Sequence, residues 1–162
     1  ALACNPDLLL ADEPTTALDV TIQAQVMDLI KELQDKYQTA MLLITHDMGV
    51  VAQVCDSVAV IYAGNILEYG TKEQIFDHPS HPYTIGLFNS IPSMSEDEEW
   101  LHPIDGLPPD PTDLPTGCPF SPRCSYATEE CKKGHIQMSL TADGHQCRCC
   151  RLDEIKQEGN KE

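Results

Sequence analysis

Two short apolar runs that each end in polar side chains constrain the fold of this chain more than any other feature. The run LLLA at 8–11 passes into Asp12 and Glu13, and the run AMLLI at 40–44 passes through a threonine into His46. Short, fully apolar runs are typical of strands buried in a parallel sheet. The carboxyl ends of parallel strands meet at one edge, where ligands collect. The sequence therefore predicts an α/β layer with these polar side chains at its functional edge.

The segments around these runs predict further helices and a hairpin. Apolar residues from Ile22 to Tyr37 recur at helical spacing after Asp19, which is expected to be the N-cap. The other expected elements are a short helix at about 48–54, a hairpin of strands at 57–62 and 66–70, a helix opened by a capping box of Thr71 and Gln74, and a helix at about 82–90. This order predicts a parallel sheet with flanking helices and an antiparallel hairpin at its edge.

Composition divides the chain into four segments. Residues 1–90 carry the α/β pattern, and residues 91–117 are expected to form a Pro-rich, acidic linker or arm that includes the run EDEE at 96–99. Residues 118–150 are Cys-rich, and residues 151–162 are expected to be a disordered polar tail.

Charge and hydropathy exclude two classes of partner. With a formal net charge of −16 and only ten Lys and Arg residues, the chain is not expected to bind nucleic acid. No apolar run is long enough to span a membrane, and no signal peptide is recognised, so a cytoplasmic location is expected. Because the chain begins without Met, with a segment resembling the last turn of a helix, we interpret it as a fragment that lacks its front.

The run LLLADEP, followed by ALD at 17–19 and then by LLITHD, closely resembles the nucleotide-binding subunits of ABC transporters. The resemblance implies that Asp12 ends the Walker B strand and holds Mg²⁺ through water, and that Glu13 is the general base for the attacking water. It implies that His46 contacts the γ-phosphate of ATP. Asp19 then ends the D-loop, which communicates across a pair of nucleotide sites.

The chemistry of phosphoryl transfer is consistent with these roles, because it needs charge neutralisation and a positioned water more than covalent chemistry. The alternative is structural: the two carboxylates would cap the turn made by Pro14, and His46 would be an ordinary structural side chain. The P-loop and the LSGGQ signature, which precede the Walker B strand in the family, are absent. The fragment alone is therefore not expected to hydrolyse ATP.

Three later stretches, YAGNILEYG, HPSHPYTIGLFNSIP and GCPFSPRC, resemble the oligopeptide and dipeptide importers among these ATPases. The resemblance implies transmembrane permease subunits and a second ATP-binding subunit, identical or homologous, as partners, and indirectly an extracytoplasmic peptide-binding protein. It places the complete protein on the cytoplasmic face of the membrane. Importers of nickel share parts of this pattern and are the alternative for the substrate.

The Cys-rich segment predicts a metal site. Six of the eight cysteines lie in the last 45 residues. The resemblance implies a four-iron four-sulfur cluster whose ligands are Cys118, Cys124, Cys131 and Cys149, with Cys147 or Cys150 as alternates for the fourth. The long spacings differ from the closely spaced pairs of zinc sites, although zinc or unligated thiols remain alternatives. His135 and His145 are taken as surface residues. The rival hypothesis for the whole chain is a non-catalytic metal or redox module.

Overall fold

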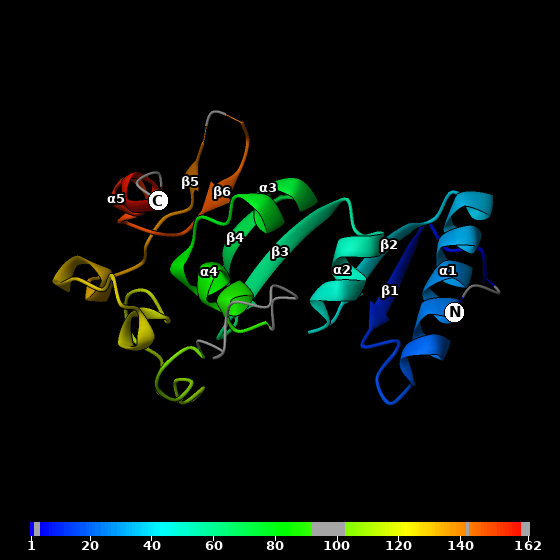
Figure 1. The fold of residues 1–162 in the computed structure, drawn as a ribbon, viewed down its shortest axis with the longest axis horizontal. Helices are drawn as coiled ribbons and strands as arrows, with labels where there is room; N and C mark the ends of the chain where they lie inside the picture. The colour runs from blue at the N-terminus through cyan, green and yellow to red at the C-terminus, as the bar shows by residue number, and fades with distance from the viewer. Residues whose placement is uncertain (2–3, 92–102, 142, 160–162) are drawn as a thin grey trace, which may run out of the picture. The chain divides into compact units, whose positions relative to one another are not determined.

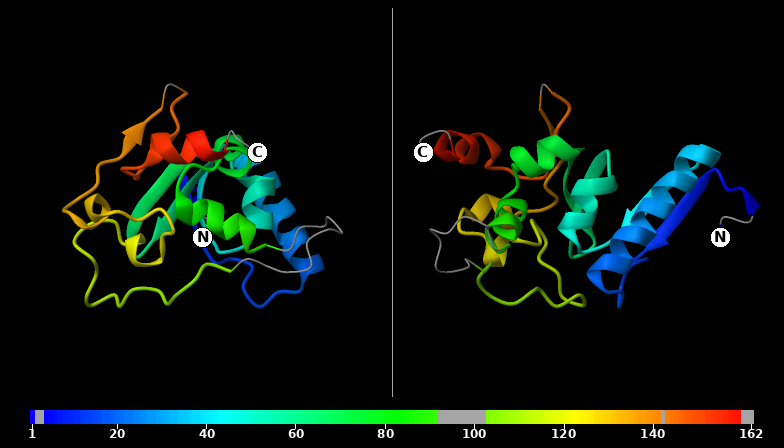
Figure 2. Two further views of the ribbon diagram at one scale, coloured as in Figure 1. Left: turned by 60° about the vertical axis from the view of Figure 1, so that its left-hand side comes forward. Right: turned by 45° about the vertical axis from the view of Figure 1, so that its right-hand side comes forward.

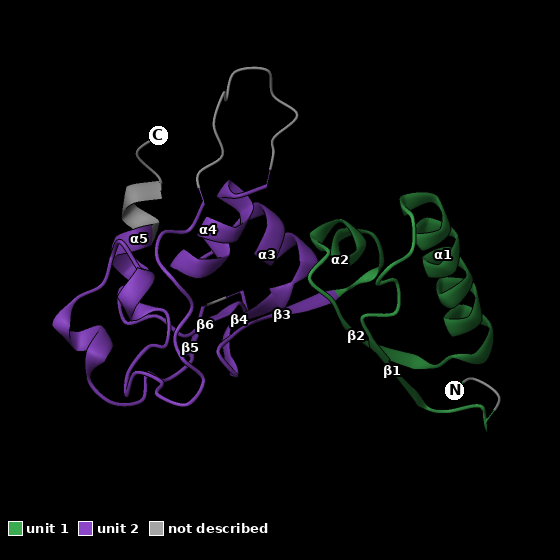
Figure 3. Ribbon diagram, turned by 90° about the horizontal axis from the view of Figure 1, so that it is seen from below, with its two compact units in different colours: residues 1–56 green, residues 57–162 purple. Residues whose placement is uncertain are grey.

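The computed structural model of the 162-residue chain describes residues 1, 4–91, 103–141 and 143–159. These residues form two compact units, residues 1–56 and residues 57–162 (Figure 3). The acidic run at 96–99 lies outside the described residues. The segment boundaries that composition suggests at 90, 117 and 150 stay predictions.

The first unit is a two-stranded parallel sheet with two helices. Strands β1 (Leu8–Asp12) and β2 (Ala40–Ile44) pair in parallel, with Asp12 opposite Ile44. Helix α1 (Val20–Tyr37) connects them and lies beside β1 (Figures 1 and 2), and helix α2 (Met48–Val54) follows β2. The predicted cap of α1 is confirmed, because Asp19 Oδ1 accepts a hydrogen bond from the Ile22 N–H at 3.0 Å.

The expectation that both strands are buried on each face is wrong for this chain. Leu8, Leu10, Leu42 and Ile44 are between 50% and 64% exposed. Alternate residues of a strand point to the same side of a sheet, and β1 and β2 pair so that Leu10 lies opposite Leu42. These four side chains therefore form one exposed apolar face.

The second unit begins with the predicted hairpin of β3 (Ser57–Tyr62) and β4 (Asn65–Thr71). Its turn places Ala63 and Gly64 at φ of 46° and 73°, which is typical of a turn whose twist matches that of the strands. The hairpin continues into β6 (Gln146–Cys147), which pairs with β4, and into β5 (Ser139–Leu140). Within the described residues, the hairpin thus pairs with strands of the Cys-rich segment instead of bordering β1 and β2.

Within the described residues, three helices and two short 3-10 turns complete this unit. Helix α3 (Lys72–Asp77) begins at the predicted capping box, which is confirmed by reciprocal hydrogen bonds between Thr71 and Gln74. Helix α4 (Pro82–Asn89) begins at His81, whose Nδ1 accepts a hydrogen bond from the Tyr83 N–H at 3.0 Å. The short turns are η2 (Ser121–Arg123) and η3 (Glu129–Lys132).

Helix α5 (Leu152–Gly159) forms where the sequence analysis expects a disordered tail. Two features explain the difference. Ile155 is only 6% exposed, so the segment is anchored by an apolar contact. Asp153 and Glu154 lie in the first turn, where their charge complements the helix dipole.

The core of the second unit joins the hairpin to the Cys-rich segment. Its buried members are Tyr62, Leu67, Cys118, Phe120 and Cys131. The Tyr62 and Phe120 rings meet edge to face with their centroids 5.5 Å apart. The hairpin therefore packs directly against the segment that carries the thiols. Among the described residues, no helix combines the length and the apolar character needed to cross a membrane.

Candidate functional site

Glu13 and His46 meet at the carboxyl ends of the two parallel strands. The Glu13 N–H donates to the Ile44 carbonyl at 2.8 Å, which extends the β1 to β2 pairing by one residue. His46 Nδ1 lies 2.8 Å from Glu13 Oε1, and the Thr16 hydroxyl donates to Glu13 Oε2 at 2.9 Å. The structure thus brings together two of the residues that the sequence places at this edge.

Glu13 and His46 each stabilise the charged form of the other. The hydrogen bond with His46, and then that from Thr16, lower the pKa of Glu13. The hydrogen bond with Glu13 and its negative charge raise the pKa of His46. Glu13 is therefore an ionised carboxylate at neutral pH.

Asp12 and Asp19 flank this pair without contacting it. Asp12 is exposed at the end of β1, and Asp19 is occupied as the cap of α1. Within the residues that the structure describes, neither carboxylate forms a hydrogen bond or an ion pair with Glu13 or His46.

Asp47, which follows His46, fixes the start of α2, a role that was not predicted from the sequence. Its Oδ1 caps α2 by accepting from the N–H groups of Gly49 and Val50, at 2.9 and 3.2 Å. Its Oδ2 accepts from Gln23 Nε2 at 2.6 Å, which links α1 to the start of α2. The hydrogen bond from Gln23 lowers the pKa of Asp47. An Asp directly before a helix is an N-cap signature that could have revealed this role.

A second candidate site lies in the Cys-rich segment, where five thiols line one small cavity. The cysteines in its lining are Cys118, Cys124, Cys131, Cys149 and Cys150. All four of the predicted ligands are thus brought together with one of the two alternates. Cys147, the other alternate, lies in β6 with no exposed surface and is not in the lining.

The backbone around Cys131 is tightly fixed. The Cys118 N–H donates to the Cys131 carbonyl at 2.8 Å. A Cβ atom added at Gly117 would lie 2.1 Å from that same carbonyl oxygen, so only glycine fits there. The backbone N–H of Thr128 donates to Cys131 Sγ at 3.5 Å, and the Arg151 N–H donates to Cys149 Sγ at 3.4 Å. Two of the sulfurs are therefore held by backbone donors.

Most of these thiols are protonated in the metal-free chain. Burial raises the pKa of Cys118 and Cys124, and it raises that of Cys149 to about 11. Cys131 differs, because burial opposes its thiolate but hydrogen bonds from the backbone and side chain of Thr128 outweigh it and lower its pKa. A metal that binds here must displace protons from the thiols.

The donor set fits an ion or cluster that takes thiolates, since at least four thiols share one cavity. The Nε atoms of Arg148 and Arg151 are buried without a hydrogen-bond partner, and Arg151 lines the cavity. Positive charge beside the thiols favours an anionic complex. Among the described residues, however, no three His, Cys, Asp or Glu side chains already stand in the arrangement of a metal site.

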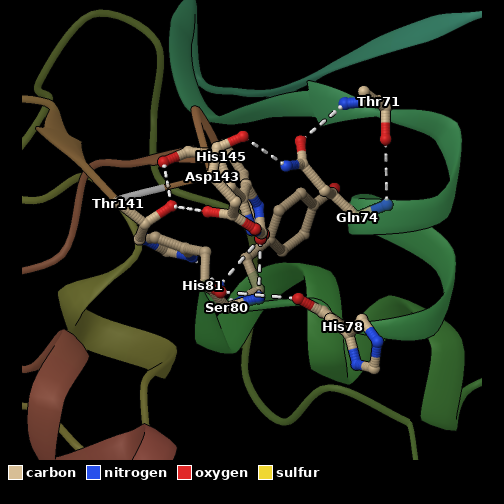
Figure 4. A network of polar contacts seen from close by, with 10 residues as sticks. Thr71, Gln74, His78, Ser80, His81, Thr141, Asp143 and His145 are labelled. Carbon is tan, nitrogen blue, oxygen red and sulfur yellow. Dashed lines mark hydrogen bonds and ion pairs between the residues drawn. The ribbon is translucent and has the colours of Figure 1, made fainter.

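A buried polar network ties the HPYT segment to the Cys-rich segment (Figure 4). Glu68 is fully buried and accepts from the N–H groups of Ser80 and His81, at 2.6 and 3.0 Å. His145 Nε2 lies 2.8 Å from Glu68 Oε1, at ion-pair distance but without the alignment of a hydrogen bond. Gln74 adds a second link, because its Nε2 donates to the Asp143 carbonyl at 3.0 Å.

This network corrects the expectation that His145 is a surface residue, because His145 is only 3% exposed. His135 is exposed as expected, and its Nε2 lies 3.1 Å from Arg148 Nη1. The role of Glu68 was not predicted from the sequence. Its signal was an acidic residue within an otherwise apolar strand, which is rare without a buried partner.

Comparisons with known proteins show which proteins the chain is similar to. Residues 67–131 match the family described as the oligopeptide/dipeptide transporter, C-terminal region. The chain is 57% identical over 157 residues to the oligopeptide transport ATP-binding protein OppD of Haemophilus influenzae, covering 96% of this chain and 48% of that protein. It is 51% identical over 154 residues to the dipeptide transport ATP-binding protein DppD of Bacillus subtilis, covering 95% and 46%.

A solved structure, cbiO1 from Clostridium perfringens, described as part of an ABC transporter complex, matches with a TM-score of 0.45 and 29% identity, over 53% of this chain and 34% of that one. The chain spans about half the length of the curated relatives that it matches. With its family region at 67–131 and this identity over most of its length, the chain is similar to about half of the length of the oligopeptide and dipeptide transport ATP-binding proteins, including their C-terminal region.

Proposed function

We propose that the complete protein binds and hydrolyses ATP to drive the import of oligopeptides or dipeptides, and that this chain is a C-terminal part of it. The observation that carries the proposal is the contact of Glu13 with His46, at 2.8 Å, at the carboxyl ends of adjacent parallel strands. The names of the relatives favour peptides over nickel as the substrate.

Each site residue then has one role. Asp12 holds Mg²⁺ through water, and this ion supplies charge neutralisation for the phosphates when it is bound. Glu13, ionised at neutral pH, orients the attacking water and takes its proton. His46, whose pKa is raised, donates to the γ-phosphate. Asp19, at the end of the D-loop, communicates with the nucleotide site of a second ATP-binding subunit.

The partners follow from this assignment. The complete protein works on the cytoplasmic face of the membrane with transmembrane permease subunits and a second ATP-binding subunit, and indirectly with an extracytoplasmic peptide-binding protein. The 162 residues contain no Gly-rich phosphate loop, so the chain alone is expected to lack ATPase activity.

We further propose that Cys118, Cys124, Cys131 and Cys149 hold a metal centre, either a four-iron four-sulfur cluster or zinc. The shared cavity supports this assignment. Its physical role is to staple the Cys-rich segment, since ligands far apart in the sequence become joined at one point. Anaerobic purification distinguishes the two: a brown protein absorbing broadly near about 400 nm indicates the cluster, and a colourless protein with stoichiometric zinc indicates zinc.

The ATPase assignment is tested with Glu13→Gln in the complete protein. The variant is expected to bind ATP normally and to lose at least about 99% of its hydrolysis, as removal of a general base costs about 10²-fold or more. Glu32→Gln, the same chemical change at an exposed position of α1, is the matched control and retains full turnover. Undiminished hydrolysis by Glu13→Gln would overturn the role of Glu13.

A further inference from the structure

Two of the thiols in the cavity are close enough to react with each other. Cys131 Sγ and Cys150 Sγ lie 3.3 Å apart. A disulfide needs its two sulfurs about 2 Å apart, so the two sulfurs must approach by only about 1 Å more. Cys150 lies beyond the four cysteines that we assign to the metal centre, and the proposed function gives it no role.

The two cysteines differ in their exposure to solvent. Cys131 is 6% exposed, and its main chain is fixed by the hydrogen bond from Cys118 and by the close approach of Gly117. Cys150 is exposed, and a single residue, Arg151, separates it from the start of α5. A reagent in solution can therefore reach Cys150 first, while Cys131 stays in place behind it.

The neighbouring Cys149 is held differently. Its sulfur accepts the Arg151 N–H at 3.4 Å, and it lines the cavity. Cys149 is therefore placed as a ligand, whereas Cys150 faces Cys131. These two adjacent cysteines therefore make different contacts.

We propose that Cys131 and Cys150 form a reversible disulfide when the chain is free of metal and meets a low-molecular-weight disulfide such as glutathione disulfide. The Cys150 thiol gives up its proton to solvent and attacks glutathione disulfide, which forms a mixed disulfide and releases one glutathione. The Cys131 thiolate then attacks the Cys150 sulfur and releases the second glutathione. The two protein thiols lose two electrons and two protons, which the two glutathione molecules carry away.

The bond has a consequence for the metal centre, and this part rests on the proposed function. A disulfide at Cys131 removes one of the four proposed ligands, and a sulfur in a disulfide no longer binds as a thiolate. Metal binding and the disulfide therefore exclude each other. The occupancy of the metal centre becomes sensitive to the redox state of the surroundings.

The test begins with the 162-residue chain, reduced, stripped of metal with a chelator and transferred to glutathione disulfide without oxygen. After free thiols are blocked, the chain is digested with trypsin and with a protease that cleaves after Glu. Cleavage after Glu130 separates Cys124 from Cys131. Mass spectrometry is expected to find residues 131–132 linked to residues 149–151. Cys149→Ser retains the linked peptide, and Cys150→Ser loses it.

A second arm repeats the oxidation with stoichiometric zinc present, and the linked peptide is expected to disappear. Linkage through Cys149, or glutathione at Cys150 without any internal bond, would overturn the proposed disulfide and leave the metal centre unaffected. A disulfide that forms equally well with zinc bound would instead count against Cys131 as a ligand. The two failures are therefore distinguishable.

Discussion

Glu68 Oε1 lies 2.8 Å from His145 Nε2, and the two residues are 0% and 3% exposed. The pair joins the hairpin strand β4 to the segment that carries Cys147, Cys149 and Cys150. Glu68 also accepts two backbone N–H groups from the start of the HPYT segment. A single buried carboxylate thus holds three parts of the second unit together.

Replacing Glu68 by Gln is expected to destabilise the chain strongly. The amide keeps the shape of the side chain but loses the charge. Its NH2 group also replaces one of the two carboxylate oxygens, each of which accepts a hydrogen bond from a backbone N–H in the native chain. Breaking one partner of a buried pair costs about 3 to 5 kcal/mol, and urea denaturation of the metal-free chain measures it. Glu130→Gln, at an exposed position, is the control. Equal stability of the two variants would contradict the role of Glu68.

The buried side chain of His81 predicts that the folded state becomes less stable as the pH falls. Burial lowers its pKa to about 4, from an ordinary value of 6.5. The folded state therefore resists protonating His81, so its contribution is complete above pH 6.5 and is lost as the pH falls toward 4. The loss amounts to about 3 kcal/mol.

The variant His81→Asn tests this dependence, since Asn is a good N-cap and does not titrate. The difference in unfolding free energy between the native chain and the variant is expected to shrink between pH 6.5 and 4. His78→Asn, at an exposed position, retains the native pH profile. If His81→Asn instead loses as much stability between pH 6.5 and 4 as the native chain does, His81 is not the cause of the acid-dependent loss.

Gly117 predicts a steric requirement at the thiol cavity. A Cβ at this position would lie 2.1 Å from the Cys131 carbonyl oxygen, so Gly117→Ala forces the backbone apart. A loss of at least about 2 kcal/mol is expected, together with a lower zinc or iron content. Gly49→Ala, whose nearest atom is a side-chain oxygen of Asp47 at 3.2 Å, is the comparison. The prediction fails if both variants keep native stability and metal content.

The thiols predict that zinc binding weakens in acid. Because burial raises the pKa of Cys118, Cys124 and Cys149, binding releases protons, and affinity falls by about tenfold per pH unit for each proton released. Competition with a chelator at several pH values measures this slope. Cys149→Ser is expected to lower the slope and the affinity, and Cys4→Ser, far from the cavity in sequence, to leave both unchanged. Zinc affinity independent of pH would argue against thiolate ligation.

The sequence predicts the local elements of this fold because their causes are local. The cap at Asp19, the capping box at Thr71 and the turn at Ala63 and Gly64 each depend on a few adjacent residues. Strands β5 and β6 were not predictable, since two-residue strands carry no periodicity and exist only through their pairing with β4. The burial of a side chain likewise depends on what packs against it.

Some contacts of the candidate sites also follow from patterns in the sequence, and others do not. The nearness of Glu13 and His46 followed from two strands that end at one edge of a sheet. The approach of Cys150 to Cys131, and of His145 to Glu68, depends on how the last third of the chain returns to the hairpin. Nothing in the spacing of these residues specifies that return.

The pairing of β4 with β6 also sets an order of events during synthesis. Glu68 and Tyr69 in β4 pair with Cys147 and Gln146, which come much later in the sequence. Until those residues leave the ribosome, the outer edge of β4 has no neighbour, and an open strand edge is a template for pairing with other chains. Closing so long a loop is slow compared with forming the hairpin. During synthesis there is therefore an interval in which the hairpin of β3 and β4 has formed while the edge of β4 that pairs with β6 is still open.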